Sequence, residues 1–259
     1  MIARILGSTA ARLLVTAAIL AYLIRGIDLR ETAAAVLHVN PWWFGGALGL
    51  VALDRAVMIV RWVMLLRSAG VALRTRKAAW IYLVSSFLGS FVPAGLGGDV
   101  SRAYAVAIRT AQGTEAVASV AIDRVLGMIA LVVLGLIGLL GWAQGLGPTM
   151  RDRVLVAVAV GGIALTSTLW MDRILGLLVA RRWQSARWDA RLVEVGDAMA
   201  AYRTRPGTLA SVFALSMAVQ VLRVFQGYCL GRGMDIDVGL TYYLVFMPIG
   251  LLLVLLPVS

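Results

Sequence analysis

The chain has 259 residues, 61% of them hydrophobic, and carries a formal net charge of +11. Soluble domains are roughly 45–50% apolar, so this hydrophobic share, with a mean hydropathy of +0.90, predicts a polytopic membrane protein and excludes an ordinary soluble one. Of the 24 basic residues, 23 are arginines, and they gather in short loops between apolar stretches, which is typical of membrane orientation signals and argues against nucleic-acid binding.

Seven apolar stretches predict membrane segments, and the first, with an uninterrupted apolar run and no convincing cleavage site, is expected to be an uncleaved helix. The stretches are residues 8–25, 42–66, 78–98, 115–142, 153–172, 207–230 and 238–258. The predicted fold is therefore an all-α polytopic membrane protein of about six to seven segments, in a single domain over residues 1–259. Between the fifth and sixth stretches, the Arg- and Trp-rich residues 173–205 suit an amphipathic helix on the cytoplasmic membrane surface.

The third stretch is expected to enter the membrane and turn back. Its apolar part, Ala78 to Val92, is shorter than the roughly 20 residues that a helix needs to cross the hydrocarbon core. Pro93, a glycine cluster and two charged residues follow. Irregular backbone at membrane depth persists only where protein buries it or where it lines a watery cavity. Re-entrant helical hairpins are therefore predicted, and they favour a protein that moves a substrate.

The distribution of basic residues supports re-entry. If residues 78–98 turn back and the N-terminus is cytoplasmic, 15 basic residues lie inside, 5 lie outside and 4 lie within helices. If the segment crosses fully, the split becomes 9 inside against 11 outside. Only the first arrangement follows the positive-inside rule.

A faint internal repeat adds to this interpretation. Arg61, Gly70, Leu83-Val84 and Pro93 are echoed by Arg223, Gly233, Leu244-Val245 and Pro257. In the predicted topology the helix with Arg61 and the helix with Arg223 run in opposite directions, so the two halves would be inverted. Inverted repeats with broken helices are a common architecture of secondary transporters.

Charged residues inside the apolar stretches are the candidate binding residues. An isolated charge in hydrocarbon costs roughly 2.5–3.5 kcal/mol on insertion scales, so each needs a partner or a function. In one interpretation Arg61, Arg124 and Arg223 attract a lipid phosphate, because the planar guanidinium can grip phosphate in two places. Acidic partners would then hold these arginines or exchange protons. In the other, the charges only lock helices together. The acidic and basic partners considered are Asp54, Arg55 and Asp123.

The hairpin itself supplies further candidates. Gly97 and Gly98 would allow a tight backbone, and Asp99 would cap a helix that begins at Val100. Exposed N–H groups at that helix start, with Arg102 in the first turn, could bind an anion. The alternative is that Asp99 only caps the helix and that Arg102 extends to cytoplasmic lipid.

Two stretches resemble the lysylphosphatidylglycerol synthase transmembrane-region family, also called flippase-like domain proteins. They are FVPAGLGGDVSRAY, residues 91–104, and ASVAIDRVLG, residues 118–127, and the preceding Arg61-Trp62 fits as well. The resemblance implies a multi-pass domain that moves lipids or lipid-linked head groups between leaflets. It also predicts a second glycine-rich turn with an Arg-Glu pair after Pro257. The sequence given ends at Ser259, so we expect either that it is a fragment or that the second hairpin is cut short.

Three functions are compatible with these features. The first is a flippase-like protein of the inner cell membrane that translocates an anionic or polyprenyl-linked lipid. The second is a membrane-embedded transferase with a lipid-phosphate donor, for which Asp99 and Asp123 are the candidate bases. The third is a non-catalytic subunit of lipid synthesis. Membrane lipids are the expected partners, and a second copy of the chain or a lipid-synthesis enzyme is the candidate protein partner. No catalytic residue, metal or cofactor is predicted, because the chain has one cysteine, one histidine and no phosphate-binding Gly-Lys-Ser/Thr loop.

Overall fold

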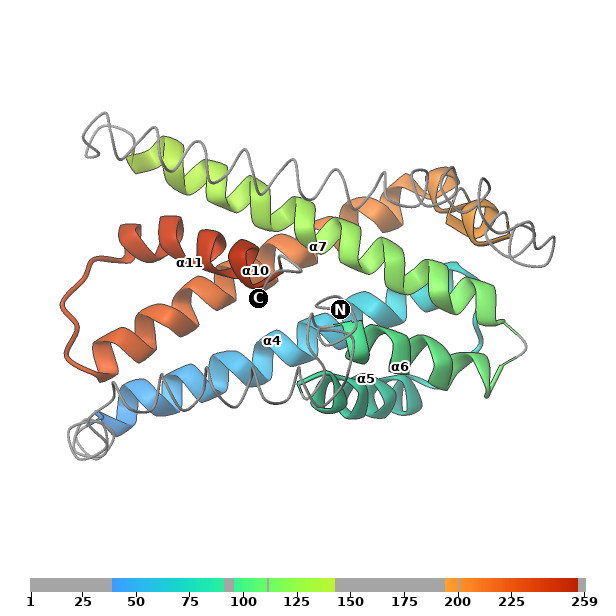
Figure 1. Cartoon of the computed structure of the whole chain (residues 1–259), viewed down its shortest axis with the longest axis horizontal. Coiled ribbons are helices and arrows are strands. Elements are labelled where there is room, and N and C mark those ends of the chain that lie inside the picture. Colours follow the sequence, from blue (N-terminus) through green and yellow to red (C-terminus); the bar gives the residue numbers. More distant parts are fainter. Residues whose placement is uncertain (1–38, 91–95, 111, 143–193, 200, 256–259) are drawn as a thin grey trace, which may run out of the picture.

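The computed structural model describes residues 39–90, 96–110, 112–142, 194–199 and 201–255, and all regular structure within them is helical. The all-α prediction is confirmed for this part of the chain. The elements are α4 (Pro41–Ser68), α5 (Thr75–Gly89), α6 (Leu96–Ala107), α7 (Gly113–Trp142), the 3-10 turn η2 (Tyr202–Thr204), α10 (Pro206–Gly233) and α11 (Leu240–Leu255) (Figure 1). The predicted segments at 8–25 and 153–172, and most of 173–205, lie outside the described residues.

Three long helices form the body of the structure. Two of them, α7 over Gly113–Leu139 and α10 over Pro206–Gly233, are long and apolar enough to cross a membrane. The third, α4, has 28 residues and so is about 42 Å long, but charged side chains interrupt its apolar surface. Asn40 begins α4 by accepting a hydrogen bond from the backbone N–H of Trp42 at 3.0 Å, and Pro41 fills the first helical position.

The helices α4 and α10 pack against each other more extensively than any other pair in the described structure. They run antiparallel. The N–H of Asn40, at the start of α4, donates to the carbonyl of Gly233 at the end of α10. At the opposite end, the hydroxyl of Tyr202, just before α10, donates to the carbonyl of Leu65 at 3.1 Å. Helix α7 lies across this pair and also contacts α6 and α11 (Figure 1).

The short helices α5 and α6 form a separate pair beside α4. With 15 and 12 residues they extend about 22 Å and 18 Å, less than the roughly 30 Å of a bilayer core. A β-carbon added to Gly98 would lie 2.9 Å from the carbonyl oxygen of Ser85, so only glycine permits this approach. The pair is consistent with the predicted hairpin, but its tip, which includes Pro93 and Gly95, lies outside the described residues, and re-entry stays a prediction.

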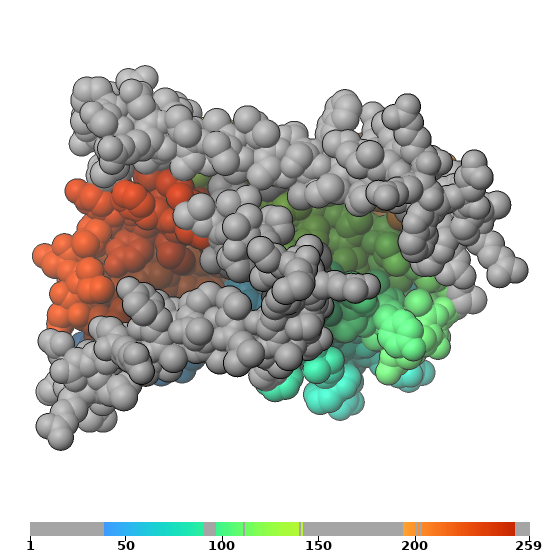
Figure 2. Space-filling view, viewed as in Figure 1, coloured from blue at the N-terminus to red at the C-terminus, as the bar shows by residue number. Residues whose placement is uncertain are grey.

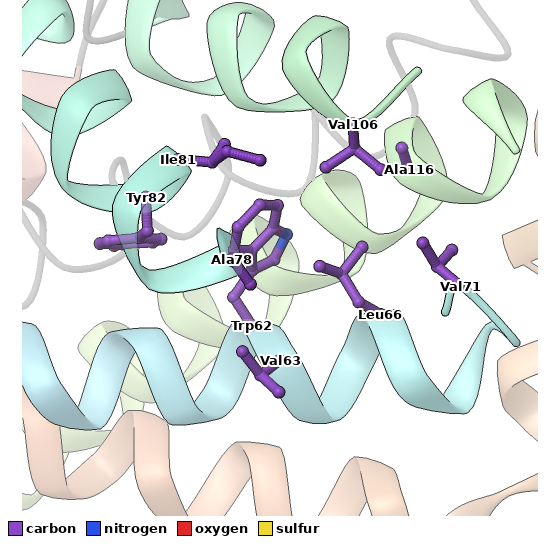
Figure 3. Close-up of a cluster of buried hydrophobic side chains, with 9 residues drawn as sticks. All are labelled: Trp62, Val63, Leu66, Val71, Ala78, Ile81, Tyr82, Val106 and Ala116. Carbon is purple, nitrogen blue, oxygen red and sulfur yellow. The ribbon is translucent and has the colours of Figure 1, made fainter. Parts of the chain in front are cut away.

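A cluster of buried apolar side chains joins the four helices α4, α5, α6 and α7 (Figure 3). Trp62 and Leu66 extend from α4 towards α5 and α6, where they meet Ala78 and Val106. Gln112, just before α7, donates to the carbonyl of Gly70 at 3.2 Å. The end of α4, the start of α5, the end of α6 and the start of α7 therefore lie together. The space-filling view has the same orientation as Figure 1. The residues coloured green and cyan lie at the lower right, and the orange and red C-terminal residues lie at the left (Figure 2).

Candidate functional site

One carboxylate at the centre of the structure joins four helices. Asp123 of α7 is 2% exposed, and its Oδ1 accepts a hydrogen bond from Nε of Arg61 on α4 at 2.6 Å. Its Oδ2 accepts from both terminal nitrogens of Arg102 on α6, each at 3.0 Å. Arg61 also donates to the hydroxyl of Ser216 on α10 at 2.9 Å. Asp123, one of the acidic partners named from the sequence, therefore holds Arg61 and Arg102.

A second carboxylate extends this network towards the hairpin pair. Asp99 of α6 forms an ion pair of 2.9 Å with Arg102 and a further ion pair with Arg124 of α7. The prediction that Asp99 caps a helix starting at Val100 is wrong. Helix α6 begins at Leu96, so Asp99 lies within its first turn, and its side chain forms ion pairs with Arg102 and Arg124.

Arg102 also differs from one of the two sequence-based interpretations. It does not extend to lipid, because it is 4% exposed and its carbon Cζ lies 5.5 Å from the ring centres of both Trp62 and Tyr82. A desolvated cation over an aromatic face gains about 2 kcal/mol or more. Arg102 is therefore held by two carboxylates and two aromatic rings.

The third carboxylate, Asp54 of α4, serves a separate group. It is 1% exposed and forms ion pairs with Arg55 at 3.3 Å and with Arg223 of α10 at 3.5 Å. Arg55 also donates to the hydroxyl of Ser86 on α5 at 3.1 Å. Asp54 and Arg61 lie seven residues apart on α4, and each also has a charged partner on another helix, Arg223 on α10 and Asp123 on α7 respectively.

A cavity of about 390 Å³ lies between these groups. Five arginines and two aspartates line it, so its wall is strongly cationic. Serines, glycines and apolar side chains complete the wall. The lining residues are Arg55, Met58, Arg61, Tyr82, Ser85, Ser86, Gly89, Ser90, Gly98, Asp99, Arg102, Asp123, Arg124, Gly127, Met128, Leu131, Val219, Gln220, Arg223 and Leu251.

The structure brings almost all the sequence-predicted residues to this cavity. Of those predicted to bind the head group, only Gly97 is not part of the wall, and it precedes Gly98 in α6. Asp54 lies behind the wall as a partner of two arginines that line it. Sequence analysis missed Tyr82 and the serines of α5. Polar Ser85 and Ser86 inside an apolar stretch were the signal available for them.

One further ion pair is not part of the cavity wall. Asp237, near the start of α11, is paired with Arg232, and both are exposed. No group of three or more His, Cys, Asp or Glu side chains suited to a metal occurs among the residues that the structure describes.

Comparison with known proteins gives one family. The family described as "Lysylphosphatidylglycerol synthase TM region" matches residues 9–259, which is most of the chain. No curated protein and no solved structure matches the chain.

Proposed function

The chain belongs to the lysylphosphatidylglycerol synthase TM region family, and from this premise we propose that it moves an anionic or polyprenyl-linked lipid between the leaflets of the cell membrane. Membership of a membrane-protein family and the apolar helices α7 and α10 make it a membrane protein connected with lipid metabolism. The translocation activity, the substrate and the inner-membrane location are the proposed part.

The observation that supports the proposal most is the cationic cavity. Five arginines but only two aspartates line this cavity of about 390 Å³, so the charge of its wall is positive. Buried arginines are expensive in hydrocarbon unless they are paired or functional, and a phosphate is the anion that a guanidinium fork fits best. A head group that crosses the membrane needs such a polar environment, while its acyl chains remain in lipid.

The arrangement of α4–α5 and α10–α11 supports an inverted repeat. Each long helix of 28 residues is followed by a turn with a left-handed residue, Gly70 or Asp235, and then by a short helix of 15 or 16 residues. The two long helices are antiparallel. Asp54 of α4 forms an ion pair with Arg223 of α10, and Ser216 of α10 accepts a hydrogen bond from Arg61 of α4. We propose that one hairpin dips in from each face of the membrane, as in secondary transporters.

A lipid-phosphate transferase remains the rival proposal. It needs a general base, and Asp123 is a poor candidate because three hydrogen bonds from two arginines occupy its oxygens. Asp99 is likewise held by Arg102 and Arg124. These contacts favour transport over transfer. Head-group turnover by pure protein in detergent, where no leaflets exist, would support the transferase instead. Normal lipid sidedness in cells that carry charge-neutralised variants would support a non-catalytic subunit.

The proposal is tested in vesicles reconstituted with the pure protein. A head-group-labelled anionic lipid in the outer leaflet should become protected from a membrane-impermeant quencher faster than in protein-free vesicles. Replacing Arg61, Asp99 or Arg124 by alanine should slow this movement. Wild-type rates in all three variants, with the proteins folded, would contradict the proposed site.

A further inference from the structure

Two strong hydrogen-bond donors in the cavity share one weak acceptor. The hydroxyl of Tyr82 on α5 donates to the sulfur of Met58 at 3.4 Å. A terminal nitrogen of Arg223 on α10 donates to the same sulfur at 3.5 Å. A thioether sulfur accepts hydrogen bonds only weakly. Both donors therefore keep most of their capacity for a stronger acceptor, and all three residues line the cavity.

The remaining contacts of Arg223 are also long. It reaches Oε1 of Gln220 at 3.5 Å and Oδ1 of Asp54 at 3.5 Å. Both distances are beyond the usual range of 2.7–3.2 Å for a hydrogen bond from nitrogen to oxygen. Oδ1 of Asp54 is buried and has no hydrogen-bond partner among the described residues.

Arg61 and Arg102 behave differently. Their hydrogen bonds to Asp123 are 2.6 Å and 3.0 Å long, and both side chains are almost fully buried. Arg61 is further bound to Ser216. A ligand that took either arginine would have to leave Asp123 with fewer partners in a buried position, which is unfavourable. These two arginines therefore shape the cavity, and Arg223 is better placed to accept a ligand.

We infer that Arg223 and Tyr82 form an anion subsite for a phosphate group, and that the sulfur of Met58, which accepts from both donors, gives way to the phosphate. The methionine side chain is unbranched and flexible, so it can move aside. The guanidinium and the phenol would then donate to oxygens of one phosphate, with charge assistance that the sulfur does not give. The inference deepens the proposed function, on which the identity of the phosphate as a lipid head group rests; free phosphate has the same binding chemistry.

The test measures binding by the full chain purified in detergent. Isothermal titration calorimetry is carried out with inorganic phosphate, with dihexanoyl phosphatidic acid and with dihexanoylglycerol, which lacks the phosphate. We expect at least one phosphate-bearing probe to bind and dihexanoylglycerol not to bind. Binding of phosphatidic acid alone assigns the subsite to a lipid head group, and equal binding of inorganic phosphate assigns it to phosphate from either source. No binding of either phosphate probe would overturn the inference.

Three variants locate the anion. Tyr82→Phe removes one hydroxyl and keeps the ring beside Arg102, and it should weaken phosphate binding about 10-fold, as expected for one hydrogen bond to a charged group. Arg223→Gln should weaken it at least as much. Met58→Leu is the matched control, because it removes the sulfur at similar volume, and binding should stay equal or become tighter. Unchanged binding by Tyr82→Phe, or lost binding by Met58→Leu, would overturn the inference.

The same variants separate this inference from the proposed function. If wild-type protein binds phosphate through Tyr82 and Arg223 but moves no lipid in vesicles, the translocation proposal fails and the subsite stands. If lipid moves at the wild-type rate in Tyr82→Phe and phosphate binding is also unchanged, the subsite fails and translocation stands.

Discussion

Arg61 of α4 and Asp123 of α7 are 62 residues apart in the chain and meet through a hydrogen bond of 2.6 Å inside the helix assembly. Both side chains are almost completely buried, at 3% and 2% exposure. Asp123 also holds Arg102, and Arg61 also holds Ser216, so this pair connects α4, α6, α7 and α10. The pair is therefore the structural centre of the cavity.

Asp123→Asn should destabilise the protein. The substitution keeps the shape but leaves Arg61 and Arg102 without their shared negative charge, and breaking a buried pair in this way costs about 3–5 kcal/mol. Thermal unfolding in detergent, followed by circular dichroism, measures the effect. Asp237→Asn is the control, because that carboxylate is 92% exposed and should change the midpoint little. Equal midpoints for both variants would mean that the Asp123 network adds no stability.

Gly98→Ala should separate α5 from α6. The new β-carbon would lie 2.9 Å from the carbonyl oxygen of Ser85, and overpacking of this kind costs about 1–3 kcal/mol. Gly49→Ala makes a matched control, because a β-carbon at that position in α4 has nothing within 4 Å in the described structure. The control should be neutral or slightly stabilising, since alanine favours a helix over glycine. Comparison of the two melting curves decides the matter, and an equally stable Gly98→Ala would show that the helices have room to spare.

Arg124→Gln should slow lipid movement in vesicles by about 10-fold or more, if the proposed head-group path uses this charge. Arg124 lines the cavity and pairs with Asp99, so its loss changes the charge that a phosphate meets there. Arg232→Gln removes an arginine with a similar ion pair at an exposed turn. Dithionite quenching of a labelled lipid gives both rates. A similar loss in both variants would point to a general effect of charge rather than to the cavity.

The hairpin topology predicts that positions 68 and 110 face the same side of the membrane. Single cysteines at Ser68 and Thr110, in a background with the buried Cys229 replaced by alanine, should react with a membrane-impermeant maleimide from one side only. The structure places these segments together, through the hydrogen bond between Gln112 and Gly70. Labelling from opposite sides would contradict re-entry and, with it, the transport proposal.

Tyr202 gives a prediction on pH. Burial raises the pKa of its hydroxyl from 10.0 to about 12. Below pH 10 the hydroxyl is neutral in both states; between pH 10 and 12 the unfolded chain ionises first, so the free energy of unfolding falls as the pH rises. Tyr202→Phe should reduce this alkaline loss and should itself cost about 1 kcal/mol, because the hydrogen bond to Leu65 is lost.

Thermal unfolding of the wild type and Tyr202→Phe at several pH values between 9 and about 12 checks this prediction. The comparison variant is Tyr104→Phe, because Tyr104 is 66% exposed. That variant should follow the wild-type curve between pH 10 and 12. The same alkaline loss in wild type and Tyr202→Phe would contradict the assignment.

The sequence predicted the helices better than their partners. Apolar length alone located α4, α7, α10 and α11 within a few residues, because each is a nearly continuous hydrophobic run. The charged positions within those runs were also identified. Which acid meets which arginine was not identified, because such pairs depend on how the helices rotate and cross. Asp99 was wrongly predicted to be a helix cap, because α6 already begins at Leu96 and includes both glycines before Asp99.

Tyr82 and Met58 show why part of the cavity could not be predicted. Both occur in apolar stretches where an aromatic ring or a thioether normally packs in a core. Met58 meets Arg223, which comes 165 residues later in the chain, only through the packing of α4 against α10. No local pattern carries that information.

The single carboxylate that fastens four helices also limits how this molecule can change shape. A motion that exposed the cavity to alternate sides by separating α4 from α7 would have to leave a buried negative charge without its cations. The junction around Asp123 is therefore expected to act as a fixed pivot, with rearrangement confined to α5 and α11, which it does not hold. Cross-linking α4 to α7 should then leave the proposed lipid movement intact, whereas tethering α5 or α11 to its neighbours should stop it.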